Sequence, residues 1–130
     1  MVKVRYYSKL GHTKDIAIAI ASGAGVDAVS ITDEPKLIEY TDVLILGGAP
    51  YADIMSPVLR EYAEKIDPKM VGKVVLFTTS NWSRRTVRAL KKIFKDKNML
   101  VDDKYFYAHM LHIKGRTEPA KEFGFKFKNK

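Results

Sequence analysis

The chain has 130 residues, the length of one ordinary domain, and its hydrophobic share of 46% and charged share of 29% are typical of a soluble globular protein. It contains no cysteine, which excludes disulfides, thiolate nucleophiles and cysteine-bound zinc or iron–sulfur clusters. Any redox chemistry therefore requires an organic cofactor or a metal on histidines and carboxylates. The net charge of +8 favours anionic partners, although an excess of lysine also serves simply as a solubilising surface.

The first half of the chain alternates between segments typical of strands and of helices. Residues 2–7 and 26–31 contain several β-branched side chains and predict two strands. Between them, residues 15–22 have isoleucines at alternate positions, but the interleaved alanines favour a buried helix. Residues 43–48 form an uninterrupted apolar run that ends in two glycines, as expected of a central parallel strand covered on both faces.

The second half continues the alternation. Ser56 and Pro57 predict the N-cap and first position of a helix, which ends at Asp67 and Pro68. Beyond it we expect, in order, a strand at residues 73–78, a helix capped by Ser83, a strand at 105–111 and a final helix at 119–128. Five strands alternating with helices predict a single α/β domain over residues 1–130, built on a doubly wound parallel sheet.

Three predicted loops carry residues suited to a bound ligand. In open parallel α/β sheets, ligands bind at the carboxyl ends of the strands, where the winding reverses. The relevant loops follow the first, third and fourth strands, at residues 8–13, 47–53 and 78–83. The candidate binding residues are Ser8, Lys9, Leu10, Gly11, His12 and Thr13 in the first loop, Ala49, Pro50, Tyr51 and Ala52 in the second, and Thr79, Ser80, Asn81 and Trp82 in the third.

The first loop leads directly into a helix. The unpaired N–H groups and positive dipole end of a helix N-terminus attract a phosphate. Ser8 and Thr13 add hydroxyl groups, and Gly11 lets the backbone approach the phosphate oxygens closely. Each loop also has an interpretation without a ligand. The six residues of the first loop fit an ordinary capped turn, Tyr51 fits a half-buried surface turn, and Trp82 fits an exposed loop.

The pattern Ser-x-x-Gly-x-Thr at residues 8–13 resembles the phosphate-binding loop of flavodoxins, whose usual form is Ser/Thr-x-Thr-Gly-x-Thr. Leu10 replaces a hydroxyl-bearing residue of that form, which implies weaker phosphate binding. Residues 47–53 are similar to the family's segment after the third strand, and residues 75–82 resemble the fourth strand and flavin loop of short-chain flavodoxins. The resemblance extends over nearly the whole chain and is weakest between residues 97 and 118.

The resemblance implies a flavodoxin-like three-layer sandwich with a five-stranded parallel sheet of order 2-1-3-4-5, and FMN as the cofactor. It further implies that Tyr51 and Trp82 stack on the isoalloxazine ring, and that Thr79, Ser80 and Asn81 contact its pyrimidine edge or the ribityl chain. The expected function is electron transfer rather than turnover of a substrate of its own. Two alternatives stay open: an FMN-dependent reductase of a small quinone-type acceptor, and a flavodoxin-fold binding module that has lost FMN and uses its basic surface to bind an acidic partner.

Cations line the outer face of the helix predicted after Ser83, namely Arg84, Arg85, Arg88, Lys91, Lys92 and Lys95. This face is either solvated or docks an acidic redox partner near Trp82, Arg84 and Arg85. Nucleic acid is disfavoured because no basic strand face is interleaved with aromatic residues. No apolar run reaches the ~18 residues of a membrane span and no signal-peptide pattern opens the chain, so we expect a cytoplasmic protein without a membrane partner.

The remaining polar pairs predict no further site. His109 and His112 are three residues apart on a predicted strand, which would point them to opposite faces and argues against a shared metal. Asp102 and Asp103 are interpreted as a solvated turn. We predict no metal site and no catalytic side chain.

Overall fold

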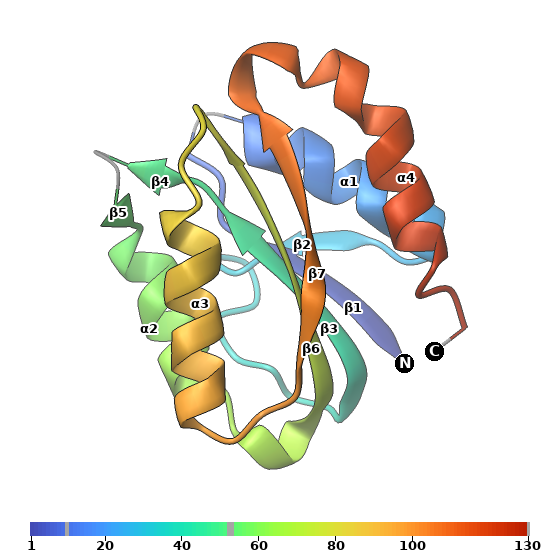
Figure 1. Ribbon diagram of the computed structural model, residues 1–130. Coiled ribbons are helices and arrows are strands. Elements are labelled where there is room, and N and C mark those ends of the chain that lie inside the picture. Colours follow the sequence, from blue (N-terminus) through green and yellow to red (C-terminus); the bar gives the residue numbers. More distant parts are fainter. Residues whose placement is uncertain (10, 52–53, 130) are drawn as a thin grey trace.

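The centre of the fold is a five-stranded parallel sheet in the order β2-β1-β3-β6-β7 (Figure 1). The computed structural model describes residues 1–9, 11–51 and 54–129, and Tyr51 by its backbone alone. The five strands are β1 (Val2–Tyr6), β2 (Ala28–Ser30), β3 (Thr41–Gly48), β6 (Val71–Ser80) and β7 (Val101–His109). Numbered in chain order within this sheet, they have the order 2-1-3-4-5, so the predicted architecture is confirmed.

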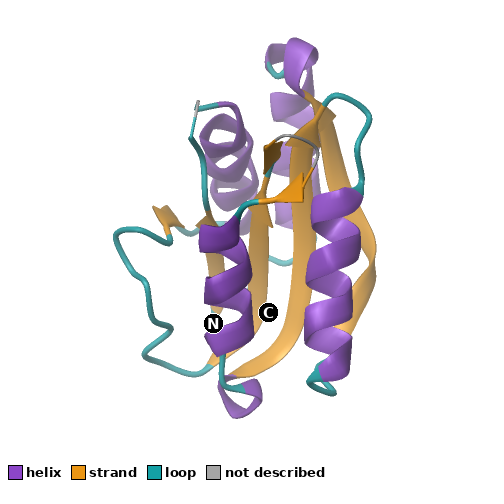
Figure 2. Ribbon diagram, turned by 90° about the vertical axis from the view of Figure 1, so that its left-hand side faces the viewer, coloured by secondary structure: helices purple, strands orange, loops and turns teal. Residues whose placement is uncertain are grey.

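Helices cover both faces of the sheet and make three layers. Helices α1 (His12–Ala24) and α4 (Thr117–Phe125) pack on one face, while α2 (Pro57–Lys65) and α3 (Arg85–Asp96) lie beside each other on the other face (Figure 2). Side chains of β3 alternate between the two cores, with Ile45 toward α1 and Leu44 and Leu46 toward α2. This is why residues 43–48 of β3 are all apolar. Among the described helices, none is both long enough and apolar enough to cross a membrane.

Glycines allow α1 and α4 to pack closely. A Cβ atom built on Gly23 would lie 1.9 Å from the carbonyl oxygen of Lys121. A Cβ atom built on Gly124 would lie 1.9 Å from the carbonyl oxygen of Ile20. No larger residue fits between the two backbones at this separation, so the crossing of α1 and α4 depends on glycine at both positions.

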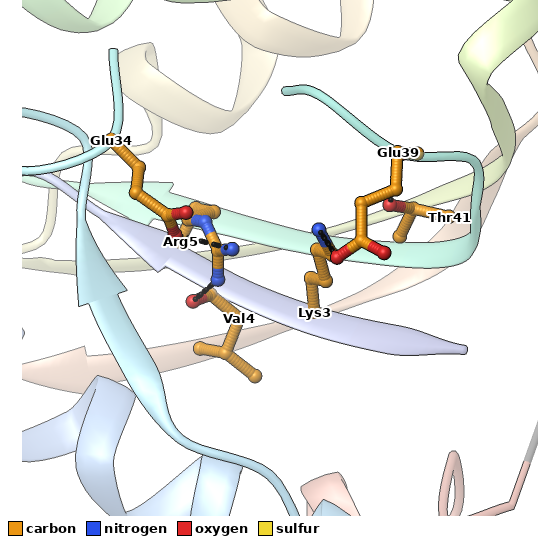
Figure 3. Close-up of polar contacts among 6 residues, drawn as sticks. All are labelled: Lys3, Val4, Arg5, Glu34, Glu39 and Thr41. Atoms are coloured by element: carbon orange, nitrogen blue, oxygen red, sulfur yellow. Dashed lines mark hydrogen bonds and ion pairs between the residues drawn. The ribbon is translucent and has the colours of Figure 1, made fainter. Parts of the chain in front are cut away.

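The connection from β2 to β3 consists of turns and bends over residues 31–40 and contains no helix. Two charged side chains of β1, Lys3 and Arg5, are buried beneath it, with 8% and 6% of their surface exposed. Lys3 Nζ lies 2.8 Å from Glu39 Oε1, and Arg5 Nη2 lies 2.7 Å from Glu34 Oε2 (Figure 3). The connecting segment therefore supplies the carboxylates that the basic strand residues need.

Two expectations about the last strand are wrong. The strand expected at 105–111 runs over Val101–His109, and Met110–His112 forms a 3-10 turn, η2. Asp102 and Asp103 lie in β7 rather than in a turn, and Asp102 Oδ2 lies 3.2 Å from Lys73 Nζ. Strand β7 lies at the edge of the sheet and residues 103–105 are exposed, so charged residues are tolerated within it.

Short elements complete the fold. The segment after β3 forms a small antiparallel pair, β4 (Pro50–Tyr51) with β5 (Ile54–Met55), which the sequence did not predict. Two further 3-10 turns are η1 (Pro68–Met70) and η3 (Lys114–Arg116). At the start of α2, Ser56 Oγ accepts a hydrogen bond from the Val58 N–H at 3.2 Å, which confirms the predicted cap. The N-cap of α3 is Arg84, one residue later than predicted.

Candidate functional site

The segments after β1, β3 and β6 meet at one edge of the sheet. The parallel register pairs Tyr6 with Gly47 and Gly48 with Thr78, so the carboxyl ends of the three strands lie at the same level. Two direct contacts tie them together. The Tyr7 N–H donates to the Gly47 carbonyl at 3.2 Å, and the Thr78 hydroxyl donates to the Gly48 carbonyl at 2.8 Å. The sheet thus brings together the three segments that contain the predicted binding residues.

The turn between β1 and α1 is shaped by Ser8 and Gly11. Ser8 Oγ accepts a hydrogen bond from the Gly11 N–H at 3.0 Å, and Gly11 has φ +94°, a left-handed conformation that favours glycine. The Gly11 carbonyl accepts the first helical bond, from the Asp15 N–H at 3.1 Å. The N–H groups of residues 12–14 consequently have no intrahelical partner and stand at the positive end of α1. Leu10 lies outside the described residues.

Lys9 and His12 are exposed at this turn, whereas Thr13 is buried. Thr13 Oγ1 lies 2.7 Å from Thr79 Oγ1, a hydrogen bond in which either hydroxyl can donate. This pair links the first turn of α1 to the end of β6. Two of the three predicted segments are therefore in direct side-chain contact.

The second segment starts inside strand β3. A Cβ atom on Gly47 would lie 2.4 Å from the Phe77 carbonyl oxygen, and one on Gly48 would lie 2.7 Å from Leu59 Cδ2. Packing within the protein thus requires glycine at position 47, because the close atom there belongs to the backbone. At position 48 the flexible end of the Leu59 side chain would have to shift. Ala49 is buried and Pro50 is half-buried at the start of β4. The side chain of Tyr51 and the whole of Ala52 lie outside the described part of the chain.

The third segment differs from the predicted loop at 78–83. Strand β6 continues to Ser80, so Thr78, Thr79 and Ser80 are strand residues that are at most 1% exposed. Their hydroxyls are engaged within the protein, and Ser80 Oγ donates to the Ser83 carbonyl at 2.6 Å. Of the predicted binding residues in this segment, Asn81 and Trp82 are the exposed ones.

Trp82 stands at the tip of the turn that follows β6, with 79% of its surface exposed. Its φ of +73° lies in the left-handed region, which is unusual for a residue other than glycine. The indole rests edge-on against His109, with the ring centroids 4.7 Å apart. A large aromatic side chain is therefore presented at the sheet edge, with its far side open.

The sequence analysis missed the contribution of β7 to this edge. The Tyr107 hydroxyl accepts a hydrogen bond from the Trp82 N–H at 2.8 Å and donates to the Ser80 carbonyl at 2.9 Å. Arg84 stacks its guanidinium carbon 3.4 Å from the centre of the Tyr107 ring and donates to the Tyr105 hydroxyl at 2.9 Å. Aromatic residues at alternate positions 105, 107 and 109 were the signal that one face of the last strand serves this edge.

The two histidines at the end of β7 are closer than the sequence predicted. His109 ends the strand and His112 lies in η2, so the two side chains do not point to opposite faces of one strand. Their ring centroids are 5.3 Å apart. Beside them, a groove of about 510 Å³ runs past the start of α1, lined by His12, Asp15 and residues 110–115. Within the residues that the structure describes, no group of three histidine or acidic side chains is arranged to hold a metal ion.

Solved structures are the known proteins to which this chain is similar. No protein-family model matches the sequence, and no curated protein matches it. Among solved structures, the flavodiiron core of Flv1 from Synechocystis is 19% identical with a TM-score of 0.76, and the alignment covers 97% of this chain. It covers 34% of the Synechocystis protein, so the chain spans about a third of that structure's length.

Two full-length flavodoxins are similar over their whole length. Oxidised Flavodoxin 2 from Bacillus cereus is 17% identical with a TM-score of 0.70, covering 97% of this chain and 99% of that one. The two-electron reduced flavodoxin from Megasphaera elsdenii is 23% identical with a TM-score of 0.67 and the same coverage of 97% and 99%. The chain therefore has the flavodoxin-like fold.

Proposed function

We propose that this protein binds FMN at the carboxyl edge of its sheet and transfers electrons to a partner protein. The observation that carries the proposal is the meeting of three chain segments at that edge, joined by the Thr13–Thr79 and Thr78–Gly48 hydrogen bonds. The flavodoxin-like fold and the sequence motif at residues 8–13 support the same ligand. The flavin supplies the one- and two-electron chemistry, and the protein supplies binding and orientation.

The turn at residues 8–13 suits a phosphate. A Cβ atom built on Gly11 would meet no atom within 4 Å, so the space in front of this residue is open among the described atoms. The N–H groups that begin α1 would donate to the phosphate oxygens, exposed Lys9 would add positive charge, and exposed His12 offers a ring nitrogen for hydrogen bonding. We assign Ser8 to holding the turn, because its hydroxyl already accepts from the Gly11 N–H.

The ring of the flavin is assigned to the other two segments. Trp82 offers an exposed indole for stacking, which contributes about 0.5–1.5 kcal/mol beyond the burial of apolar area. We propose that Tyr51 stacks on the opposite side, and that Ala49, Pro50, Ala52 and Asn81 contact the ring through their peptide or amide groups. Thr79 and Ser80 are assigned to shaping the floor of the site, because their hydroxyls already bond to Thr13 and Ser83.

A titration with two flavins tests this proposal. FMN fluorescence should be quenched on addition of the protein, whereas riboflavin, which lacks the phosphate, should bind more weakly. Quenching by neither flavin would overturn the proposed function and favour the alternative of a module without cofactor. Equal affinity for the two flavins would show that the turn at residues 8–13 does not bind the phosphate.

We further propose that the redox partner is acidic and that transfer takes place in the cytoplasm. Helix α3 starts next to the Trp82 turn and exposes Arg85, Arg88 and Lys95. Together with the net charge of +8, this surface favours encounter with a negatively charged protein. Reduction by an acidic and by a basic flavoprotein reductase of similar potential tests whether the partner is acidic. The acidic reductase should reduce the FMN-loaded protein faster at low ionic strength.

A further inference from the structure

The turn that carries Trp82 is held in a conformation that its own sequence does not favour. A non-glycine residue with φ near +73° costs about 1 kcal/mol or more relative to the right-handed region. Trp82 is also 79% exposed, so burial of the indole does not stabilise this conformation. Besides the edge-on contact of the indole with His109, the hydrogen bonds of its backbone hold this conformation.

Both peptide groups of Trp82 are held by side chains. Its N–H donates to the Tyr107 hydroxyl at 2.8 Å, and its carbonyl accepts from Arg84 Nη1 at 3.1 Å. The Tyr107 hydroxyl itself donates a hydrogen bond to the Ser80 carbonyl at 2.9 Å, which ties the turn back to the end of β6. The hydroxyl of Tyr107 thus bridges the residues before and within the turn.

Arg84 is in turn fixed by β7. Its guanidinium carbon lies 3.4 Å from the centre of the Tyr107 ring, and its Nε donates to the Tyr105 hydroxyl at 2.9 Å. A cation over an aromatic face and a directed hydrogen bond together restrict the side chain to one orientation. Two aromatic residues of an edge strand therefore determine where the Trp82 backbone lies.

We propose that Tyr107 and Arg84 are positioning residues that preorganise Trp82 for stacking on the isoalloxazine ring, an inference that rests on the proposed function. Neither residue is assigned a contact with the flavin. A turn that is already ordered loses less conformational entropy when the ligand binds, and this raises affinity without adding a contact. Loss of the Tyr107 hydroxyl should release the Trp82 N–H while keeping the ring on which Arg84 stacks.

The test compares Tyr107→Phe with Tyr40→Phe, a matched control at the exposed end of the β2–β3 connection. Tyr107→Phe should raise the Kd for FMN about three- to tenfold, because the released turn must then be ordered on binding, and Tyr40→Phe should leave the Kd unchanged. In a Trp82→Gly background, the Tyr107→Phe change should no longer alter the Kd, because the ring that it positions is gone.

A second readout needs no flavin. Trp82 is the single tryptophan, so its fluorescence anisotropy reports the order of this turn directly. The cofactor-free Tyr107→Phe protein should show lower anisotropy than the unaltered protein. If the unaltered protein takes up FMN and Tyr107→Phe binds it equally well with equal anisotropy, the inference is wrong and the proposed function stands. If the unaltered protein takes up no FMN, the proposed function itself fails.

Discussion

At the residue scale, the buried pair Thr13 and Thr79 joins the first helix to the end of β6. Replacing either residue by valine keeps the shape but leaves the other hydroxyl without its partner. Each single change should lower the free energy of unfolding by about 1–3 kcal/mol. The double change should cost less than the sum of the two, because no unpaired hydroxyl remains. Urea denaturation of the four proteins measures this, and strictly additive losses would contradict a direct bond.

A second residue-scale prediction concerns pH and Glu39. The hydrogen bond and the charge of Lys3 lower the pKa of the Glu39 carboxyl below 4.5. A carboxyl with a lowered folded-state pKa stabilises the fold above its unfolded pKa, and this contribution is lost as the pH falls through the folded value. Glu39→Gln should therefore be less stable than the unaltered protein near neutral pH, and the difference should disappear on acidification. A difference that persists at acidic pH would rule out the ionised pair as its cause.

At the element scale, the crossing of α1 and α4 depends on Gly23 and Gly124. Helix propensity alone would make Gly23→Ala stabilising by about 1 kcal/mol. Because the added Cβ would lie 1.9 Å from the Lys121 carbonyl oxygen, we expect the opposite sign, a loss of about 2 kcal/mol or more. Gly115→Ala is the matched control, since its Cβ would meet nothing within 4 Å, and it should change stability by less than about 0.5 kcal/mol. Thermal unfolding measures the sign of the change in stability. A Gly23→Ala protein more stable than the unaltered protein would refute the close crossing of the two helices.

Elements also show what a sequence can and cannot predict. The run at residues 43–48 predicted β3 well, because a strand covered on both faces must be apolar throughout. The start of β7 was missed because it is charged: Asp103 is exposed, and half-buried Asp102 is paired with Lys73 of the neighbouring strand. The end of β6 was taken for a loop because Thr79 and Ser80 are polar. Their hydroxyls are satisfied inside the protein, by Thr13 on helix α1 and by the Ser83 carbonyl in the next turn.

The candidate site also has one part that the sequence predicts and another part that it does not. The motif at residues 8–13 is local, so Gly11 and the start of α1 could be predicted near this turn. The bracing of Trp82 by Tyr107 joins residues 25 positions apart, and no local pattern specifies that contact. Similarly, the burial of Arg5 in β1 became understandable only when Glu34 was seen beside it.

At the scale of the whole molecule, the net charge of +8 should control partner encounter. Reversing Arg88 and Lys95 on α3 to glutamate lowers the charge by 2 at each position, from +8 to +4. Reversing exposed Lys121 and Lys126 near α4 gives the same net charge on the other face. The α3 pair should slow electron transfer from an acidic reductase and weaken its dependence on salt, measured by stopped-flow absorbance. Equal slowing by both pairs would mean that total charge, and not the α3 surface, governs encounter.

The central claim is that FMN binds where the segments after β1, β3 and β6 meet. Amide chemical shifts of the uniformly ¹⁵N-labelled protein, recorded with and without FMN, test it most directly. We expect the shifts to change at residues 8–14, 49–55 and 79–83 and to stay constant at the opposite edge of the sheet. Unchanged spectra in excess FMN, or changes confined to another surface, would contradict the account.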